Sequence, residues 1–256
     1  MTVREIYDLI DAFAPFETQA DFDNSGLLTG SARQDVHTIL FALDLTESVI
    51  SEASNIGAEL IVTHHPLMFS PIRRLTDEDY EARLLRHLIR ENISLIAAHT
   101  NLDQAHGGMN DVLADLCGLH DISGEGFLRT GFLTEPMTAE AYAVFLSSRL
   151  KTTVRLMGPE KATVSKVGLC SGGGGDEWPG AADAGCNAFV SGEIKHHLAL
   201  AMADRGIVAF ECGHFSTEAP GLSALAAALQ KKLNTLKCNV RILESASKAY
   251  AFPPKP

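Results

Sequence analysis

Histidines and acidic residues follow three apolar runs of this chain, at points where buried strands are expected to end. The clearest case is GAELIVTHHPLMFS, residues 57–70, in which two adjacent histidines and a proline follow the apolar run. The three sets are His64 and His65 after ELIVT, His99 and Asp103 after ISLIAA, and His214 and Glu218 after GIVAFE. Imidazole and carboxylate together suit zinc, iron or manganese. The residue types therefore predict metal chemistry.

The adjacent histidines favour two ions over one. Neighbouring residues at a strand end point in different directions, because the pleat alternates their side chains. One ion is hard to chelate with both His64 and His65, whereas two ions a few ångströms apart could take one histidine each. Asp103 and Glu218 each carry two oxygens and could bridge or cap the pair. Such a pair of ions lowers the pKa of a shared water until hydroxide forms near neutral pH.

Other histidines of the chain have simpler explanations. Those expected to be ordinary surface or core residues are His37, His87, His120, His196 and His197. His99 and His106 lie near the proposed ligands, and a role in orienting a carboxylate is as consistent with their positions as ligation. Adjacent histidines alone are weak evidence, so the convergence of three segments carries the metal hypothesis.

Two further features could support other chemistries. In CSGGGGDEWPG, Gly173 and Gly174 could present backbone amides to a phosphate, but the stretch matches neither a P-loop nor GxGxxG. A flexible glycine loop explains it equally well. Cys170 and Cys212 lie near strand ends, where a thiol nucleophile is conceivable, but buried inert cysteine is the better explanation. The chain has no GxSxG motif.

Alternating strands and helices must position these side chains. The predicted strands cover 37–43, 59–63, 93–98, 152–158, 165–170, 187–192, 206–212 and 239–243. The predicted helices cover the N-terminal segment, 46–57, 77–91, 109–116, 139–150, 194–205 and 219–233, with Pro220 in the first turn of the last. This order predicts mostly parallel sheets with helices on both faces. Ligands are then expected beyond the carboxyl ends of the strands.

The alternation pauses once, which predicts two α/β domains. A linker is expected at 119–126, the first domain at 1–124 and the second at 125–234. The segment 235–256 is expected to pack back on the first domain. The two halves show a similar order of features. The first half runs strand, HHP, helix, strand and HTNLD, and the second runs strand, GEIKHH, helix, strand and GHFSTE.

Composition narrows the possible partners. A formal charge of −11 argues against an extended interface with nucleic acid or anionic lipid, because both need a basic surface. No apolar stretch approaches the length needed to cross a bilayer, and the N-terminus lacks a signal-peptide pattern. Five scattered cysteines without a CxxC pair indicate a reduced protein with no disulfide framework. We expect a cytoplasmic protein that binds a small molecule.

Taken together, these residues resemble the NIF-three family (NGG-one-interacting factor three-like). Its bacterial members are often labelled GTP cyclohydrolase 1 type 2 homologues or dinuclear metal centre proteins. The matching stretches are DFDNSGLLTG, ELIVTHHPLMF, AAHTNLDQAHGGMNDVLA, VGLCSGGGGD, FVSGEIKHHLAL and ECGHFSTEAPGL. Phe22 departs from the pattern, since many relatives have tryptophan before the DN.

The resemblance implies a ligand set and an assembly. The family's metal ligands fall on His64, His65, Asp103, His214 and Glu218. The family fold is two similar α/β/α domains with the metals in the cleft between them, and members form a homohexamer, a trimer of dimers. The long insert domain of some members is not expected, because only about forty residues separate FLRTGF from VGLC.

The leading hypothesis is a metal-dependent hydrolase, and GTP is a plausible substrate by resemblance. No separate general base is identifiable from the residues. The alternatives are a metal-handling or regulatory protein and an interaction adaptor. An open coordination position holding water favours catalysis, whereas saturation by protein ligands favours metal handling.

Overall fold

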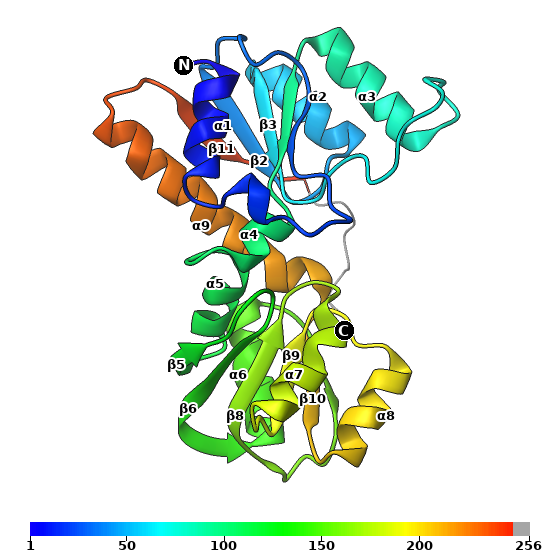
Figure 1. The fold of residues 1–256 in the computed structure, drawn as a ribbon, viewed down its shortest axis with the longest axis vertical. Coiled ribbons are helices and arrows are strands. Elements are labelled where there is room, and N and C mark those ends of the chain that lie inside the picture. The colour runs from blue at the N-terminus through cyan, green and yellow to red at the C-terminus, as the bar shows by residue number, and fades with distance from the viewer. Residues whose placement is uncertain (248–256) are drawn as a thin grey trace. The chain divides into compact units, whose positions relative to one another are not determined.

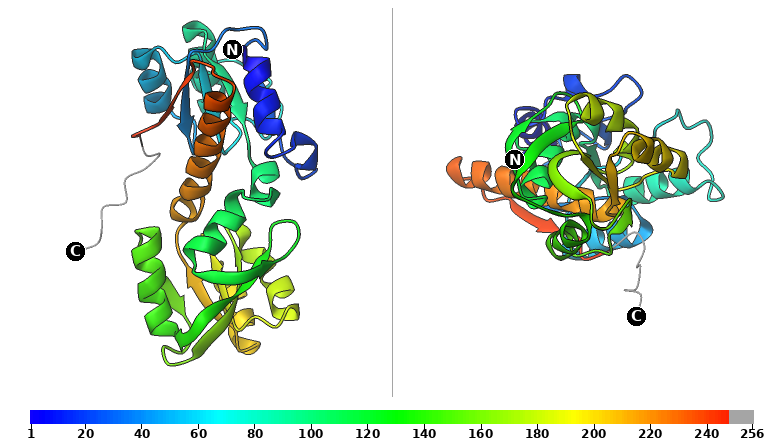
Figure 2. Two further views of the ribbon diagram at one scale, coloured as in Figure 1. Left: turned by 90° about the vertical axis from the view of Figure 1, so that its left-hand side faces the viewer. Right: turned by 90° about the horizontal axis from the view of Figure 1, so that it is seen from below.

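The protein is described by a computed structural model that covers residues 1–247 (Figures 1 and 2). Part of the predicted C-terminal segment, 248–256, lies outside the described residues. Contacts divide the chain into two compact units. Unit 1 comprises Met1–Ala105 and the described residues from Leu222 onward, and unit 2 comprises His106–Gly221. These bounds differ from the predicted 1–124 and 125–234, because the helix at 109–116 packs on strands of unit 2.

Unit 1 is built on a five-stranded sheet in the order β1-β4-β3-β2-β11. Its strands are β1 Gly26–Thr29, β2 Thr38–Ala42, β3 Leu60–Thr63, β4 Ser94–Ala97 and β11 Arg241–Glu244. The helices in its N-terminal segment, Met1–Ala105, are α1 Val3–Asp11, α2 Glu47–Ile56, α3 Tyr80–Glu91 and α4 Thr100–Gln104, with a 3-10 turn at Phe16–Thr18. Strands β4, β3, β2 and β11 are parallel, and β1 pairs antiparallel with β4.

Helices cover both faces of the unit 1 sheet. Leu40 and Ile61 face α2 and α3, which contribute Val49, Leu84 and Leu88 to one buried cluster. Helix α1 and the C-terminal part of α9 (His214–Thr235) lie on the opposite face (Figures 1 and 2). Alternate residues of each strand are therefore buried on alternate faces, as the continuous apolar runs predict.

Unit 2 repeats this three-layer plan around a mixed sheet in the order β5-β6-β8-β9-β10-β7. Its strands are β5 Leu119–Ser123, β6 Arg129–Thr138, β7 Arg155–Met157, β8 Thr163–Cys170, β9 Ala188–Ser191 and β10 Val208–Glu211. Its helices are α5 Met109–Leu116, α6 Ala139–Leu150, α7 Trp178–Asp183, α8 His196–Asp204 and the start of α9. Strands β8, β9 and β10 are parallel. Helices α5 and α6 pack on one face and α7 and α8 on the other.

The two units share an order of elements at their centres. In unit 1 the chain runs β2, α2, β3, α3, β4 and α4, and in unit 2 it runs β8, α7, β9, α8, β10 and α9. The predicted fold class, two similar α/β/α domains with parallel or mixed sheets, is confirmed. The similar motifs lie at matching positions in these two series. HHP follows β3 and GEIKHH follows β9, whereas HTNLD follows β4 and GHFSTE follows β10.

Three local predictions are corrected. The expected linker 119–126 contains strand β5. This strand has no apolar pattern that would predict it, because all its residues after Leu119 are exposed. Helix α9 begins at His214 rather than near 219, so Pro220 lies inside the helix and not in its first turn. The buried residues Leu222, Leu225 and Leu229 anchor that helix beyond the proline and offset the hydrogen bond that proline removes.

Side-chain caps explain several helix starts. Thr46, Asp79 and Thr138 accept hydrogen bonds from backbone N–H groups three residues ahead, at the starts of α2, α3 and α6. Within residues 1–247, no helix combines the length and apolar character that crossing a membrane requires.

Candidate metal centre

The parallel pairing of unit 1 brings three loops to one edge of its sheet. Ala42 pairs with Thr63 and Thr63 pairs with Ala97, so β2, β3 and β4 end side by side. The residues just beyond these ends include Asp44, the adjacent histidines and His99. This is the edge at which open parallel sheets bind ligands.

The turn after β3 is held by its own backbone. The His65 N–H donates to the Leu43 carbonyl at 3.1 Å, and the Thr63 hydroxyl donates to the His65 carbonyl at 2.8 Å. Pro66 follows and is buried, and it has no N–H with which to extend the strand pairing. His64 is therefore fully buried, whereas the His65 side chain is 21% exposed.

Three imidazoles of unit 1 converge beyond this edge. His64, His65 and His99 each offer a ring nitrogen within 4.8 Å of those of the other two. Their ring centroids lie 4.9 Å apart for His64 and His65, 5.0 Å for His64 and His99, and 5.5 Å for His65 and His99. Three imidazole rings this close together are typical of a metal site and not of an apolar core.

Each of these rings has an oxygen acceptor at Nδ1. His64 Nδ1 donates to the Ala98 carbonyl, His65 Nδ1 to Asp44 Oδ1 and His99 Nδ1 to Asp23 Oδ1, all at 2.8 Å. A proton fixed on Nδ1 makes Nε2 the nitrogen that carries the lone pair. Metal-binding histidines are usually oriented by such an acceptor.

Asp103 lies next to the buried imidazole of the cluster. It belongs to α4, and its Oδ1 is 3.5 Å from His64 Nε2. Two ligand atoms bound to one tetrahedral ion at about 2.1 Å are separated by about 3.4 Å. The two atoms therefore have the spacing of neighbouring ligands of one ion.

Asp23 organises the loop that supports His99. Its side chain is fully buried, and it accepts hydrogen bonds from the Asn24 and Thr100 backbones and from the hydroxyls of Ser25 and Thr100. Burial opposes its ionisation, but the hydrogen bonds from His99 and Thr100 prevail and hold its pKa well below the usual range. Asp23 is therefore a carboxylate at neutral pH.

Unit 2 presents a second pair of metal-type ligands. His214 and Glu218 lie one turn apart in α9, with Nε2 and Oε1 separated by 3.0 Å. His214 Nδ1 faces Glu193 Oε1, also at 3.0 Å. Glu193 follows β9 and His214 follows β10, which are paired in parallel. The pattern of a carboxylate at Nδ1 is thus the same in both units.

Gly172, which follows β8, packs directly against this pair. Its φ is +54°, and a Cβ at this position would lie 1.9 Å from Glu218 Oε1 and 3.1 Å from His214 Nε2. Gly173 has open space where a Cβ would be, and a Cβ on Gly174 would meet the Cys170 sulfur. The glycine loop therefore makes room for His214 and Glu218, and the glycine in contact with them is Gly172.

The donor chemistry of both units fits a divalent transition metal. The predicted ligands are imidazoles and carboxylates, which suit zinc, iron or manganese. Cys212 does not compete as a ligand or nucleophile, because burial raises the pKa of its thiol well above the usual range.

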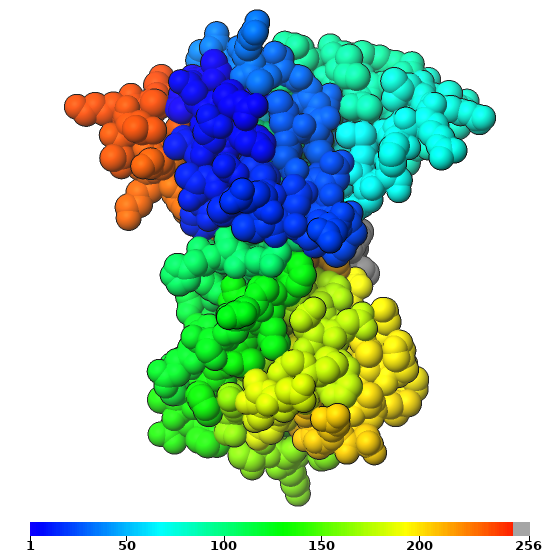
Figure 3. Space-filling model, viewed as in Figure 1, coloured from blue at the N-terminus to red at the C-terminus, as the bar shows by residue number. Residues whose placement is uncertain are grey.

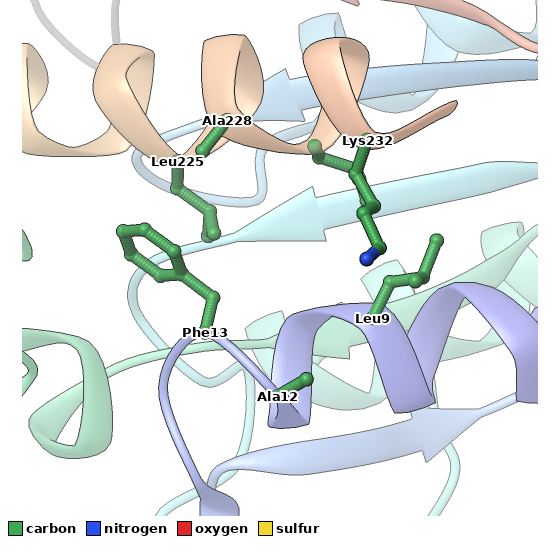
Figure 4. A pocket seen from close by; sticks show the side chains of 7 residues that line it. Leu9, Ala12, Phe13, Leu225, Ala228 and Lys232 are labelled. Atoms are coloured by element: carbon green, nitrogen blue, oxygen red, sulfur yellow. The ribbon is translucent and has the colours of Figure 1, made fainter. Parts of the chain in front are cut away.

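Other features take no part in this chemistry. His196 and His197 are exposed in the first turn of α8, whose outer surface is yellow in Figure 3. A cavity of about 220 Å³ separates α1 from α9 in unit 1 (Figure 4). Its lining residues are Leu9, Ala12, Phe13, Leu225, Ala228, Leu229 and Lys232. This lining is apolar apart from one amine and holds no combination of ligands.

Comparison with known proteins identifies the family. The family model Duf34/NIF3 (NGG1p interacting factor 3) matches residues 1–249. The chain belongs to this family. A GTP cyclohydrolase 1 type 2 homolog of Clostridium perfringens is 32% identical over 245 residues, covering 92% of this chain and 94% of that protein. One of Campylobacter jejuni is 34% identical over 220 residues, covering 85% and 88%.

Solved structures agree with the family assignment. A hypothetical protein of Staphylococcus aureus has a TM-score of 0.93 and 28% identity, and 99% of each chain is covered. The resemblance drawn from the sequence motifs is therefore confirmed.

Four residues of the site were not identified from the sequence. Asp23, Asp44 and Glu193 hold ring nitrogens, and Gly172 makes room for Glu218. Asp44 follows a predicted strand, which was an available signal. The partner of each carboxylate depends on which loops meet, and nothing in the local sequence shows it.

Proposed function

We propose that the protein binds two divalent transition metal ions and uses them to hydrolyse a small molecule. The ligands are His64, His65 and Asp103 of unit 1 and His214 and Glu218 of unit 2. Family membership supports this set, together with the ligand chemistry within each unit. The ions are zinc, iron or manganese, and availability decides among metals that accept the same ligands.

One observation carries the proposal: every histidine of the set has an oxygen acceptor at Nδ1. An imidazole held in this way keeps its Nε2 lone pair in a fixed direction, which raises metal affinity. The acceptors are the Ala98 carbonyl, Asp44 and Glu193.

When bound, the ions would supply Lewis acidity and lower the pKa of coordinated water. The chain's own residues orient and restrict that chemistry. Asp103 and Glu218 are largely buried, with 13% and 6% of their side chains exposed, so their charge is available to cations without a large solvent shell. Gly172 leaves space at Glu218 that any larger residue would occupy.

The proposed substrate is a nucleotide such as GTP. This step rests on the names of the relatives, which are GTP cyclohydrolase 1 type 2 homologs. The described residues do not include a base-recognition pocket that we can assign. We also propose that the protein assembles as a homohexamer, a trimer of dimers, on the basis of the family resemblance.

The test combines metal analysis with turnover. Protein purified without added metal is analysed for its ions, then loaded with zinc, iron or manganese and assayed on GTP and on simple phosphoesters. We expect two ions per chain, and we expect Asp103→Ala to lose one ion and at least 100-fold in rate. His87→Gln is the matched control, because His87 also has a carboxylate at Nδ1 but lies outside the cluster.

The outcomes separate the parts of the proposal. Absence of bound metal under all loading conditions would contradict the metal centre. Two bound ions with no turnover, or turnover that ignores Asp103→Ala, would remove the hydrolase and leave a metal-handling or regulatory protein.

A further inference from the structure

We propose that His99 is a metal ligand of unit 1 and that Asp23 positions it. This inference rests on the proposed metal centre and adds a ligand that the five-residue set lacks. Sequence alone gave equal support to ligation and to a carboxylate-orienting role for His99. In the structure the His99 Nδ1 donates to Asp23, which is not among the proposed ligands and accepts four other hydrogen bonds from its own loop and from α4.

The spacing of the rings supports ligation. An imidazole bound through Nε2 at about 2.1 Å places its ring centroid about 3.2 Å from the ion. Two such rings in a tetrahedral arrangement have centroids about 5.2 Å apart. The His99 ring lies 5.0 Å from the His64 ring and 5.5 Å from the His65 ring, and these distances bracket that value, so His99 has the spacing to share an ion with either histidine.

The orientation of His99 is fixed from two sides. Asp23 holds Nδ1 at 2.8 Å, and the Phe69 ring packs edge-on against the imidazole at a centroid distance of 5.6 Å and an interplanar angle of 76°. The His99 backbone N–H donates to the Ser25 hydroxyl at 3.1 Å. A side chain restrained in this way pays little entropy on binding an ion.

His87 shows what a histidine–carboxylate pair looks like without a site. Its Nδ1 is 2.7 Å from Glu47 Oε2 on the surface of unit 1, and it belongs to neither group of candidate ligands among the described residues. The distinguishing property of His99 is therefore the cluster it joins and not the carboxylate alone.

The decisive variant is His99→Asn. An asparagine Nδ2 takes the place of the imidazole Nδ1, so the hydrogen bond to Asp23 is kept while Nε2 is removed. Metal affinity is measured by competition with a chelator, and the imidazole ligands are counted by X-ray absorption and by pulsed electron paramagnetic resonance of a copper- or manganese-loaded sample. We expect one imidazole to disappear from the spectra and the affinity of one ion to fall at least tenfold.

A second variant tests the positioning residue. Asp23→Asn leaves all imidazoles in place, so we expect an unchanged imidazole count. We expect a loss of affinity of about 10- to 100-fold, which is typical when the carboxylate that orients a metal-binding histidine is lost. Glu47→Gln, which removes the equivalent charge beside His87, is the control and should leave affinity within twofold. Circular dichroism verifies that each variant is folded.

The results distinguish this inference from the proposed function. If wild-type protein binds metal and His64→Ala or Asp103→Ala loses it, while His99→Asn keeps the full spectrum and affinity, then His99 is no ligand. If the wild-type protein binds no metal, the proposed centre itself fails.

Discussion

At the scale of single residues, the chemistry depends on how each imidazole is held. A histidine free to rotate and to change tautomer is a weak ligand, because binding must order it. Asp44, Asp23 and Glu193 remove that freedom from His65, His99 and His214, and they lie on three different loops. The proposed ligands therefore depend on carboxylates from other loops for their orientation.

Gly172 provides a test at this scale. Gly172→Ala would place a methyl group 1.9 Å from Glu218 Oε1, so we expect the carboxylate to be displaced and metal affinity to fall at least tenfold. Isothermal titration with zinc measures the effect. Gly185→Ala is the control for backbone strain, since its φ is +78° and nothing lies within 4 Å of its added Cβ. Equal losses of affinity in both variants would contradict the steric explanation.

At the scale of elements, caps and buried ion pairs hold the layers in place. Thr138→Ala removes the side chain that accepts from the Ala141 N–H at the start of α6. We expect the free energy of unfolding to fall by about 1 kcal/mol. Urea denaturation measures it, and Ser148→Ala on the exposed side of α6 should leave it unchanged or slightly higher.

An ion pair joins α5 to β6 and makes unit 2 sensitive to acid. Burial opposes ionisation of Asp111, but the Gly107 N–H and the Arg129 guanidinium outweigh it and hold the pKa of this carboxyl below its usual value. The stability that this pair contributes is present above the unfolded-state pKa, about 3.9, and is lost as pH falls through the lower folded-state pKa.

Asp111→Asn tests that dependence. Above pH 5 we expect the variant to be about 2 kcal/mol less stable than the wild type, because a charged hydrogen-bonded partner of buried Arg129 is lost. Below the folded-state pKa the two proteins should converge. A constant difference in the free energy of unfolding across this pH range would contradict the ion-pair explanation.

At the scale of the whole molecule, metal binding and assembly should be coupled to stability. Ions that bind only the folded chain stabilise it by mass action. We expect removal of metal with a chelator to lower the melting temperature, and added zinc to restore it. Asp103→Ala, with fewer ligands, should show a smaller shift, whereas His87→Gln should behave like the wild type.

The proposed assembly is tested on the same samples. Sedimentation equilibrium should give a mass near six times that of the 27.5 kDa chain. A monomer at all accessible concentrations would contradict the hexamer without affecting the ligands within each unit.

The convergence of His64, His65 and His99 could be predicted from the sequence, because their positions follow from local rules. Apolar runs predict strands, and in parallel sheets the residues after neighbouring strands meet at one edge. The edge strand β5 and the first turns of α9 were harder to predict. Strand β5 has a polar pattern. The first turns of α9 contain Pro220, and proline usually lies near a helix start.

By itself the sequence determined the fold class, the family and the types of side chain that follow each strand end, since these depend on periodicity and on residue chemistry. Only the tertiary structure decided which oxygen meets each ring nitrogen. His99 and Asp23 are 76 residues apart, and Glu193 and His214 are 21 apart. Such pairs form because separate loops fold to the same place, which no local pattern encodes.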